Sequence, residues 1–197
     1  MNLLDYEREC MCAGFNLICG VDEAGRGPLA GPVVAAALIP DFDNIIEGIN
    51  DSKKLTDKQR RELYPYITEN AVAYRTALCA HDVIDEINIL QATKRAMTDG
   101  VNSLLPVPHI VLIDAVKLTL PIPCRAIIHG DALSYAIAAA SIIAKVERDN
   151  MMIRYAELYP EYGFEQHKGY ATKMHIERLK KYGPSPIHRK TFIKNFV

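Results

Sequence analysis

The sequence predicts an α/β protein, because apolar runs typical of strands open the chain and then alternate with segments of helical periodicity. Its 197 residues suit one domain with at most a small appended element. Hydrophobic residues make up 49% and charged residues 24%, a composition that indicates a globular protein and excludes a disordered or fibrous one. No repeat, low-complexity tract or linker divides the chain, so we expect residues 1–197 to form one domain.

The first half of the chain predicts three strands and one helix. Residues 16–21 and 33–39 are apolar, β-rich runs on either side of a Gly/Pro turn, which indicates two hairpin-linked strands. Residues 56–70 have helical spacing with Thr56 as the N-cap, and Pro65 should end or kink this helix. Residues 71–80 alternate like a third strand.

The second half predicts two short strands between two longer helices. Residues 82–104 carry helical spacing, and residues 109–114 and 125–129 have the pattern of buried strands. Residues 134–158 form the strongest helical pattern, in which the alanines at 138–140 permit close packing against a sheet.

Two adjacent carboxylates, Asp22 and Glu23, stand where the first apolar run ends, directly before Gly25, Arg26 and Gly27. Neighbouring side chains of a strand point to opposite faces, but a turn at the strand end can aim both acids at one site. Such a pair favours a hard-metal site, with Arg26 and the glycine amides ready to hold a phosphate or a sugar. A plain surface turn explains this segment equally well.

Two further acids follow apolar runs, namely Asp114 after residues 111–113 and Asp131 after residues 127–128. A helix-cap role explains Asp131 on its own, and a turn explains Asp114 less well because Ala115 follows without turn chemistry. Four carboxylates at strand ends repel one another unless divalent cations fill the site. Two such ions can activate a water and stabilise the leaving oxygen of a phosphodiester.

Charge is unevenly distributed along the chain. Residues 165–197 contain eight Lys or Arg and two Asp or Glu, a balance of +6, and the remainder carries −7. Histidine and aromatic residues are interleaved with these cations, as expected where phosphates and stacked bases share a surface. The alternative is a solvated amphipathic helix.

The five cysteines have no C-x-x-C spacing and indicate free thiols in a reducing compartment. The first residues include acids in place of a basic, apolar signal, and the longest apolar run, residues 135–144, is too short to span a membrane. We therefore expect a cytoplasmic location and no membrane contact.

A series of sequence blocks closely resembles the bacterial ribonuclease HII family. The blocks occur in the family's order from about residue 18 to residue 192. They are DEAGRGPLAGPV at 22–33, NDSKKL at 50–55, INIL at 87–90, LID at 112–114, AAASIIAKV at 138–146, YGF at 162–164, HKGY at 167–170 and GPSPIHR at 183–189.

The resemblance implies a ribonuclease H-like fold, with a mixed five-stranded sheet flanked by helices and a helical C-terminal element, residues 165–197, that contacts nucleic acid. It also implies endonucleolytic cleavage of RNA in RNA–DNA hybrids and of duplex DNA 5′ to a lone ribonucleotide, leaving 5′-phosphate and 3′-hydroxyl ends. We expect a monomer, and contact with a sliding clamp stays open.

Carried over by position, the resemblance makes the four acids the catalytic ligands of Mg²⁺ or Mn²⁺. It makes residues 25–27 the loop that senses the ribose 2′-hydroxyl and Tyr170 the side chain that stacks on the neighbouring deoxyribose. Candidate phosphate contacts are Lys53, Lys54, Lys145 and Lys168.

Two positions depart from the family pattern. Ala115 replaces a usual glycine and His129 a usual lysine, which puts rate and metal preference in doubt.

Four other functions are alternatives to a metal-dependent ribonuclease. A proofreading exonuclease also uses four acids and two metals, but acts on strand ends. A dinucleotide-binding loop is disfavoured, because Gly31 lies one residue beyond the G-x-G-x-x-G position. A non-catalytic hybrid-binding protein would lack an acid, and histidine acid–base cleavage would proceed without metal.

Overall fold

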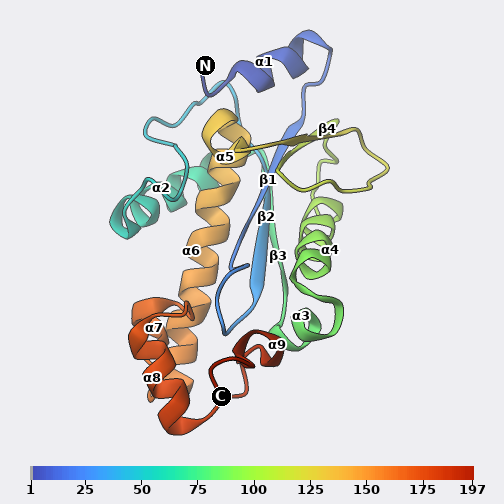
Figure 1. Cartoon of the computed structure of the whole chain (residues 1–197). Coiled ribbons are helices and arrows are strands. Elements are labelled where there is room, and N and C mark those ends of the chain that lie inside the picture. The colour runs from blue at the N-terminus through green and yellow to red at the C-terminus, as the bar shows by residue number, and fades with distance from the viewer. Residues whose placement is uncertain (1) are drawn as a thin grey trace.

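A computed structural model, which describes residues 2–197, contains one mixed sheet in the strand order β3-β2-β1-β4-β5 (Figure 1). The strands are β1 Ile18–Ala24, β2 Val33–Ile39, β3 Ala73–Cys79, β4 Ile110–Asp114 and β5 Cys124–Ile127. β1, β2 and β3 pair antiparallel, whereas β4 runs parallel to both β1 and β5. The predicted α/β class and five-stranded mixed sheet are confirmed.

Helices cover both faces of this sheet. α6 and α2 pack on one face, and α4 packs on the other, as Figure 1 shows. The helices are α1 Asp5–Cys12, α2 Asp57–Asn70, α3 His81–Ile87, α4 Ile89–Asn102, α5 Gly130–Leu133, α6 Tyr135–Leu158, α7 Phe164–His167, α8 Lys173–Tyr182 and α9 Lys190–Ile193.

The two central strands are buried on both faces, which explains their continuous apolar sequence. In β2, Ala35 and Ala37 face α4, whereas Ala36 and Leu38 face α6. α6 approaches β1 so closely that a Cβ at Gly20 would lie 2.1 Å from a backbone atom of Ala136. The small residues of α6 and β1 therefore set the short distance between this helix and the central strand of the sheet, which carries Asp22 and Glu23.

The helix predicted at residues 56–70, with Thr56 as its N-cap, is confirmed as α2, and Pro65 lies inside it without ending it. The capping box of Thr56 and Gln59 starts this helix, and hydrogen bonds from Arg61 to Asn150 (2.8 Å) and from Tyr64 to Glu147 hold it on α6. These tertiary bonds compensate for the backbone donor that proline lacks.

The helix expected at residues 82–104 is divided into α3 and α4 at Asn88. This residue has φ +67°, in the left-handed region, and its side chain accepts hydrogen bonds from the amides of Leu90 and Gln91. Asparagine tolerates this conformation and can cap the next helix, so one residue ends α3 and starts α4.

α1 was not predicted. Its buried Glu7 accepts hydrogen bonds from the Ser134 hydroxyl (2.5 Å) and the Ala136 amide (3.0 Å), and so caps the start of α6. Burial raises the pKa of Glu7. Because its partners lie more than 120 residues away, local periodicity could not indicate this role.

α7, α8 and α9 lie at one end of the molecule, over the loop that joins β1 to β2 (Figure 1). Leu29 from this loop packs with Leu179 and Ile193, so the loop and the C-terminal element share a small apolar cluster. Within residues 2–197, no helix combines the length and the hydropathy that a membrane crossing requires.

Candidate active site

Three aspartates from different elements converge at one edge of the sheet. Asp22 lies near the end of β1, Asp114 ends the adjacent parallel strand β4, and Asp131 lies in α5. Each offers one carboxylate oxygen, and these oxygens all lie within 4.8 Å of one another. The sheet topology therefore brings Asp22 next to two acids that lie more than 90 residues later in the chain.

Local backbone geometry explains the position of Asp114 and Asp131. The Asp114 carboxylate accepts a hydrogen bond from the Gly130 amide (2.7 Å), which links β4 to α5. A Cβ at Gly130 would lie 2.6 Å from Ile137 Cδ1 and 3.3 Å from Asp114 Oδ1, so a larger residue here would have to displace the Ile137 side chain. Ala115 and His129, on either side of this contact, both have positive φ values, +50° and +58°.

Asp131 does not cap a helix, although its position in the sequence would be explained by a capping role. Ser134 caps α6, and Asp131 lies inside α5. Its carboxylate instead accepts a hydrogen bond from Lys53 Nζ at 2.5 Å. Arg60 donates to the carbonyls of Ser52 and Leu55 and so shapes the turn that carries Lys53.

The aspartate site has the electrostatics of a cation site. Burial raises the pKa of Asp22 well above its usual range, and the carboxylates of Glu23 and Asp114 raise it further. Burial also raises the pKa of Asp114. Oxygen ligands grouped in this way suit a hard divalent cation, which would remove the repulsion between them. The residues present therefore fit such an ion.

Glu23 is next to Asp22 in the sequence, but it is not among the three acids whose carboxylate oxygens lie within 4.8 Å of one another. Its Oε1 accepts from Arg26 at 3.5 Å, and its Oε2 is buried without a hydrogen-bond partner among the described residues. Burial raises the pKa of Glu23, and Arg26 opposes that effect. A buried carboxylate oxygen without a partner is costly, and a bound cation would satisfy it.

The loop of residues 25–32 is held from behind by two fully buried arginines. Arg189 donates to the carbonyls of Gly25 (2.6 Å), Arg26 (3.0 Å), Gly31 (2.9 Å) and Pro32 (3.2 Å). Arg148 donates to the carbonyls of Pro32, Lys168 and Ala30. Burial and the neighbouring Arg148 lower the pKa of Arg189 to about 9.

These bonds determine which side of the loop faces away from the arginines. A trans peptide unit is planar, so its N–H points opposite to its C=O. Because the carbonyls of Gly25 and Arg26 point at Arg189, the amides of Arg26 and Gly27 point away from it. The anchor thus presents two consecutive backbone donors on the opposite side.

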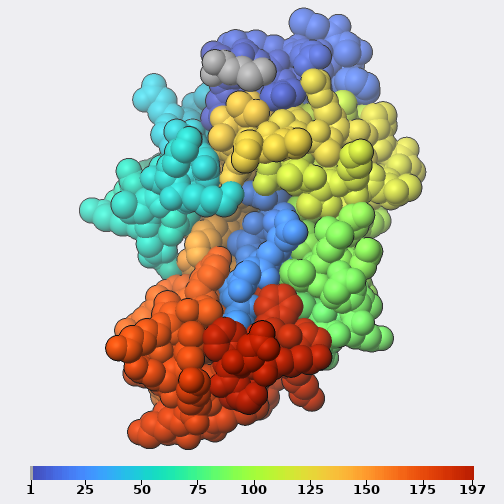
Figure 2. Space-filling view, in the orientation of Figure 1, coloured from blue at the N-terminus to red at the C-terminus, as the bar shows by residue number. Residues whose placement is uncertain are grey.

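A cleft of about 390 Å³ joins this loop to the acids. Its lining includes Asp22, Glu23, residues 24–27, Ser52, Lys53, Arg60, Lys145 and Tyr170. Figure 2 shows the hollow where the blue surface of β1 and its loop lies between the cyan segment before α2 and the orange C-terminal element. The Tyr170 ring forms one wall, since a Cβ at Gly27 would lie 3.8 Å from Tyr170 Cε1.

The predicted lysines separate into two groups. Lys53 and Lys145 line the cleft, and Lys145 pairs with Asp149 at 2.8 Å and lies 5.6 Å from the Tyr170 ring centroid. Lys54 is exposed in the turn before α2. Lys168 donates to the carbonyl of Glu165.

The roles of the two buried arginines, Arg148 and Arg189, were not predicted. A signal existed for Arg148, which follows Ala136, Ala140 and Ala144 at intervals of four residues and therefore lies on the same face of α6. Arg189 ends the sequence block at 183–189, but nothing in the sequence indicated its role, because its partners lie more than 150 residues away in the chain.

Comparison with known proteins decides the family. The sequence profile described as Ribonuclease HII matches residues 19–195. The chain belongs to the ribonuclease HII family. It is 53% identical to a ribonuclease HII of Ruminiclostridium cellulolyticum, over 99% of this chain and 77% of that protein, and 50% identical to one of Caldicellulosiruptor saccharolyticus, over 100% and 96%.

Solved structures agree with the family assignment. The ribonuclease H2 of Pyrococcus horikoshii superposes with a TM-score of 0.75 at 31% identity, covering 88% of this chain and 92% of that one. The ribonuclease HII of Archaeoglobus fulgidus, solved in complex with PCNA, gives 0.76 at 28% identity over 91% and 96%. The ribonuclease H-like fold is confirmed, and the chain is a type 2 ribonuclease H, a divalent-metal-dependent hydrolase that acts on RNA–DNA hybrids.

Proposed function

We propose that this ribonuclease HII cleaves duplex DNA on the 5′ side of a single embedded ribonucleotide, as well as the RNA strand of hybrids, and leaves 5′-phosphate and 3′-hydroxyl ends. One observation carries the proposal. The loop of residues 25–27 and the Asp22 carboxylate line the same cleft, so a ribose read by the loop would place its phosphate near the acids.

Asp22, Asp114 and Asp131 would hold the metal, with Glu23 completing the set, and Mg²⁺ or Mn²⁺ suits these oxygen ligands. When bound, two such ions would supply the charge that activates a water and stabilises the leaving oxygen. Lys53 donates to the Asp131 carboxylate and lines the cleft, so its ammonium group would contact a phosphate bound there.

The amides of Arg26 and Gly27 supply the donors that read the sugar. A 2′-hydroxyl both donates and accepts hydrogen bonds, and it distinguishes RNA from DNA at one nucleotide. Because Arg189 orients these amides before substrate arrives, little conformational entropy is lost when they bind it. Tyr170 would stack on the neighbouring deoxyribose, and Lys145 would contact a phosphate.

Residues 165–197 would form the basic element of this single domain that contacts the duplex. The structure divides its charges, since Arg189 is buried, whereas Lys180 and Lys181 are exposed on α8. Lys54 and Lys168 remain weaker candidates for phosphate contacts. Neutralising Lys180 and Lys181 together should weaken duplex binding and flatten its dependence on salt, because fewer counterions are released.

We further propose that the protein acts as a monomer in the cytoplasm. All five cysteines are free thiols, which suits a reducing compartment. The archaeal relative solved with PCNA makes contact with a sliding clamp a reasonable hypothesis for this chain.

Cleavage of matched duplexes with zero, one or several ribonucleotides, each with and without EDTA, tests the proposed function. We expect cleavage of both ribonucleotide-containing duplexes, no cleavage of the all-DNA duplex, and no activity in EDTA. Activity in excess chelator would favour histidine acid–base chemistry instead. A closed circular duplex with one ribonucleotide separates this endonuclease from an exonuclease, which requires a strand end.

A further inference from the structure

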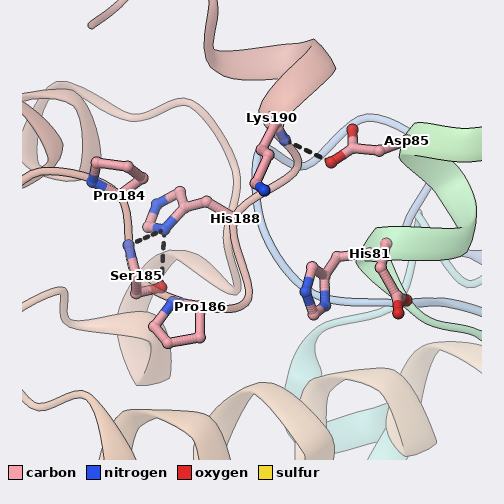
Figure 3. Close-up of a pocket in the computed structure, with 8 residues that line it drawn as sticks. His81, Asp85, Pro184, Ser185, Pro186, His188 and Lys190 are labelled. Atoms are coloured by element: carbon pink, nitrogen blue, oxygen red, sulfur yellow. Dashed lines mark hydrogen bonds between the residues drawn. The ribbon is translucent and has the colours of Figure 1, made fainter.

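Three buried histidines, His167, His175 and His188, form a cluster inside the C-terminal element, in which His175 is hydrogen-bonded to His188 and stacks on His167 at a ring-centroid distance of 4.3 Å. His175 Nε2 lies 3.0 Å from His188 Nε2, and His175 Nδ1 lies 2.9 Å from the Tyr170 carbonyl. This series of hydrogen bonds ends at Ser185, whose amide and hydroxyl lie 2.9 and 2.8 Å from His188 Nδ1. Figure 3 shows Ser185 and His188 beside a hollow, which has a volume of about 490 Å³.

The partners fix the protonation of each ring. A carbonyl only accepts, so His175 Nδ1 carries a hydrogen and donates to Tyr170. The Ser185 amide only donates, so His188 Nδ1 is bare and accepts. Burial lowers the pKa of both rings to about 4, so each is neutral at pH 7. His188 Nε2 must then donate to His175 Nε2, and all the bonds run in one direction from Ser185 to Tyr170.

His167 supports the same segment from the other side. Its Nε2 lies 2.9 Å from the Tyr162 carbonyl, and its Nδ1 accepts from the Gly169 amide at 3.1 Å. The Gly169 carbonyl accepts from the Leu29 amide at 2.8 Å. Residues 167–170 are therefore held by two imidazole rings and by the β1–β2 loop.

The relay of Ser185, His188 and His175 also joins Tyr170 to that loop. His188 forms a backbone bridge with Ala30, and the next residue, Arg189, donates its amide to the Leu29 carbonyl (2.8 Å). A displaced His188 would therefore disturb both the Tyr170 carbonyl and the backbone pairing of the loop. Asp85 holds the following residues by accepting from the amides of Lys190 and Thr191.

We propose that the Ser185–His188–His175 relay positions Tyr170 against Gly27, and that these two histidines are positioning residues for substrate recognition. The inference rests on the proposed function, in which Tyr170 contacts the sugar next to the ribonucleotide. Tyr170 is 42% exposed, so the cleft wall it forms depends on its backbone being held in place. The relay supplies that support without touching the substrate itself.

A double-mutant cycle tests whether His175 acts through Tyr170. On a duplex with one ribonucleotide, His175→Phe should lower kcat/KM roughly 2- to 12-fold, the worth of one hydrogen bond. Tyr170→Ala removes the ring but keeps the carbonyl, and in that background His175→Phe should have almost no further effect. The same loss in both backgrounds would overturn the proposal, since His175 would then act by another route.

Two further variants control the cycle. His175→Asn places an amide donor near the position of Nδ1 but has no group at the position of Nε2, so it should keep the bond to the Tyr170 carbonyl, lose the bond to His188, and have a kcat/KM between those of the wild type and His175→Phe. His81→Asn changes a histidine that lines the hollow in Figure 3 outside the relay, and should leave kcat/KM unchanged. If the wild type cleaves this duplex but Tyr170→Ala has no effect, the positioning role is wrong. Failure of the wild type to cleave it would instead overturn the proposed function.

Imidazole ¹⁵N NMR of the wild type tests the relay without any substitution. It therefore still tests the proposal in the case that the His175→Phe variant does not fold. At pH 7 we expect His175 as the Nδ1–H tautomer, with His188 and His167 as Nε2–H tautomers. A charged ring, or the opposite tautomer at His175 or His188, would overturn the relay.

Discussion

Gly25 and Gly27 belong to the same short loop, yet the structure predicts that alanine has opposite effects at the two positions. Gly25 has φ +99°, and a Cβ there would lie 2.0 Å from Arg148 Nε. Gly27 has an ordinary φ, and a Cβ there would meet only Tyr170 Cε1, at 3.8 Å, a normal contact distance. Gly25→Ala should therefore damage the fold, and Gly27→Ala should damage recognition.

The expected magnitudes follow from these contacts. For Gly25→Ala, the left-handed conformation costs about 1–2 kcal/mol. Displacing Arg148 from the Pro32 carbonyl breaks a hydrogen bond to a charged group, worth about 1.5–3 kcal/mol. At about 2–4 °C per kcal/mol for a chain of this size, Tm should fall by roughly 5–20 °C. For Gly27→Ala, the free energy of unfolding should change by no more than about 0.5 kcal/mol.

Recognition should show the reverse order. The Gly27→Ala methyl would stand in the cleft beside the amides that read the 2′-hydroxyl, and loss of one buried polar contact costs about 1–3 kcal/mol, or roughly 5- to 150-fold in kcat/KM. Thermal unfolding and steady-state cleavage of a duplex with one ribonucleotide measure both effects. A wild-type Tm for Gly25→Ala, or a wild-type kcat/KM for Gly27→Ala, would refute this reasoning.

Three further predictions concern the acids, the strained turn and the histidines. Asp22→Asn should nearly abolish turnover yet raise Tm in EDTA at pH 7, because it removes a buried like charge; near-normal turnover would contradict the site. Ala115→Gly should raise Tm by about 2–4 °C, because φ +50° costs alanine about 1 kcal/mol, and a lower Tm would show that the turn is unstrained. In urea unfolding, His175 and His188 should each contribute up to about 1.4 kcal/mol per pH unit to a loss of stability as pH drops from 6.5 to 4, since only the unfolded chain takes up those protons, while the raised pKa values of Asp22 and Asp114 add a slope of the opposite sign. His188→Gln should reduce the contribution of the histidines, and an unchanged pH dependence would mean that His188 is already charged.

Much of the sheet was predictable because its signal is local. The prediction of a strand at residues 33–39 matches β2, since continuous apolar sequence is required where a strand is buried on both faces. The first strand was expected to end at residue 21 but continues to Ala24, so Asp22 and Glu23 are strand residues. Acids are rare in central strands, and sequence patterns therefore place the boundary too early.

The candidate site was only partly predictable for the same reason. The acids, residues 25–27 and Tyr170 were predicted from strand ends and family resemblance, and the structure brings Asp22, Asp114 and Asp131 together. The support behind them was not found, because Arg189 and the histidine relay act through backbone carbonyls and ring nitrogens from distant segments. Such partners follow from tertiary packing, which no local pattern reports.

The central claim is that the 2′-hydroxyl is read by the loop and does not act as the nucleophile. Mass spectrometry of the products from a duplex with one ribonucleotide tests this claim most directly. Cleavage should occur on the 5′ side of the ribonucleotide and leave a 5′-phosphate and a 3′-hydroxyl, and a 2′-deoxy or 2′-fluoro sugar at that position should suppress it. A 2′,3′-cyclic phosphate at any time point would make the hydroxyl the nucleophile and contradict metal-assisted hydrolysis by this site.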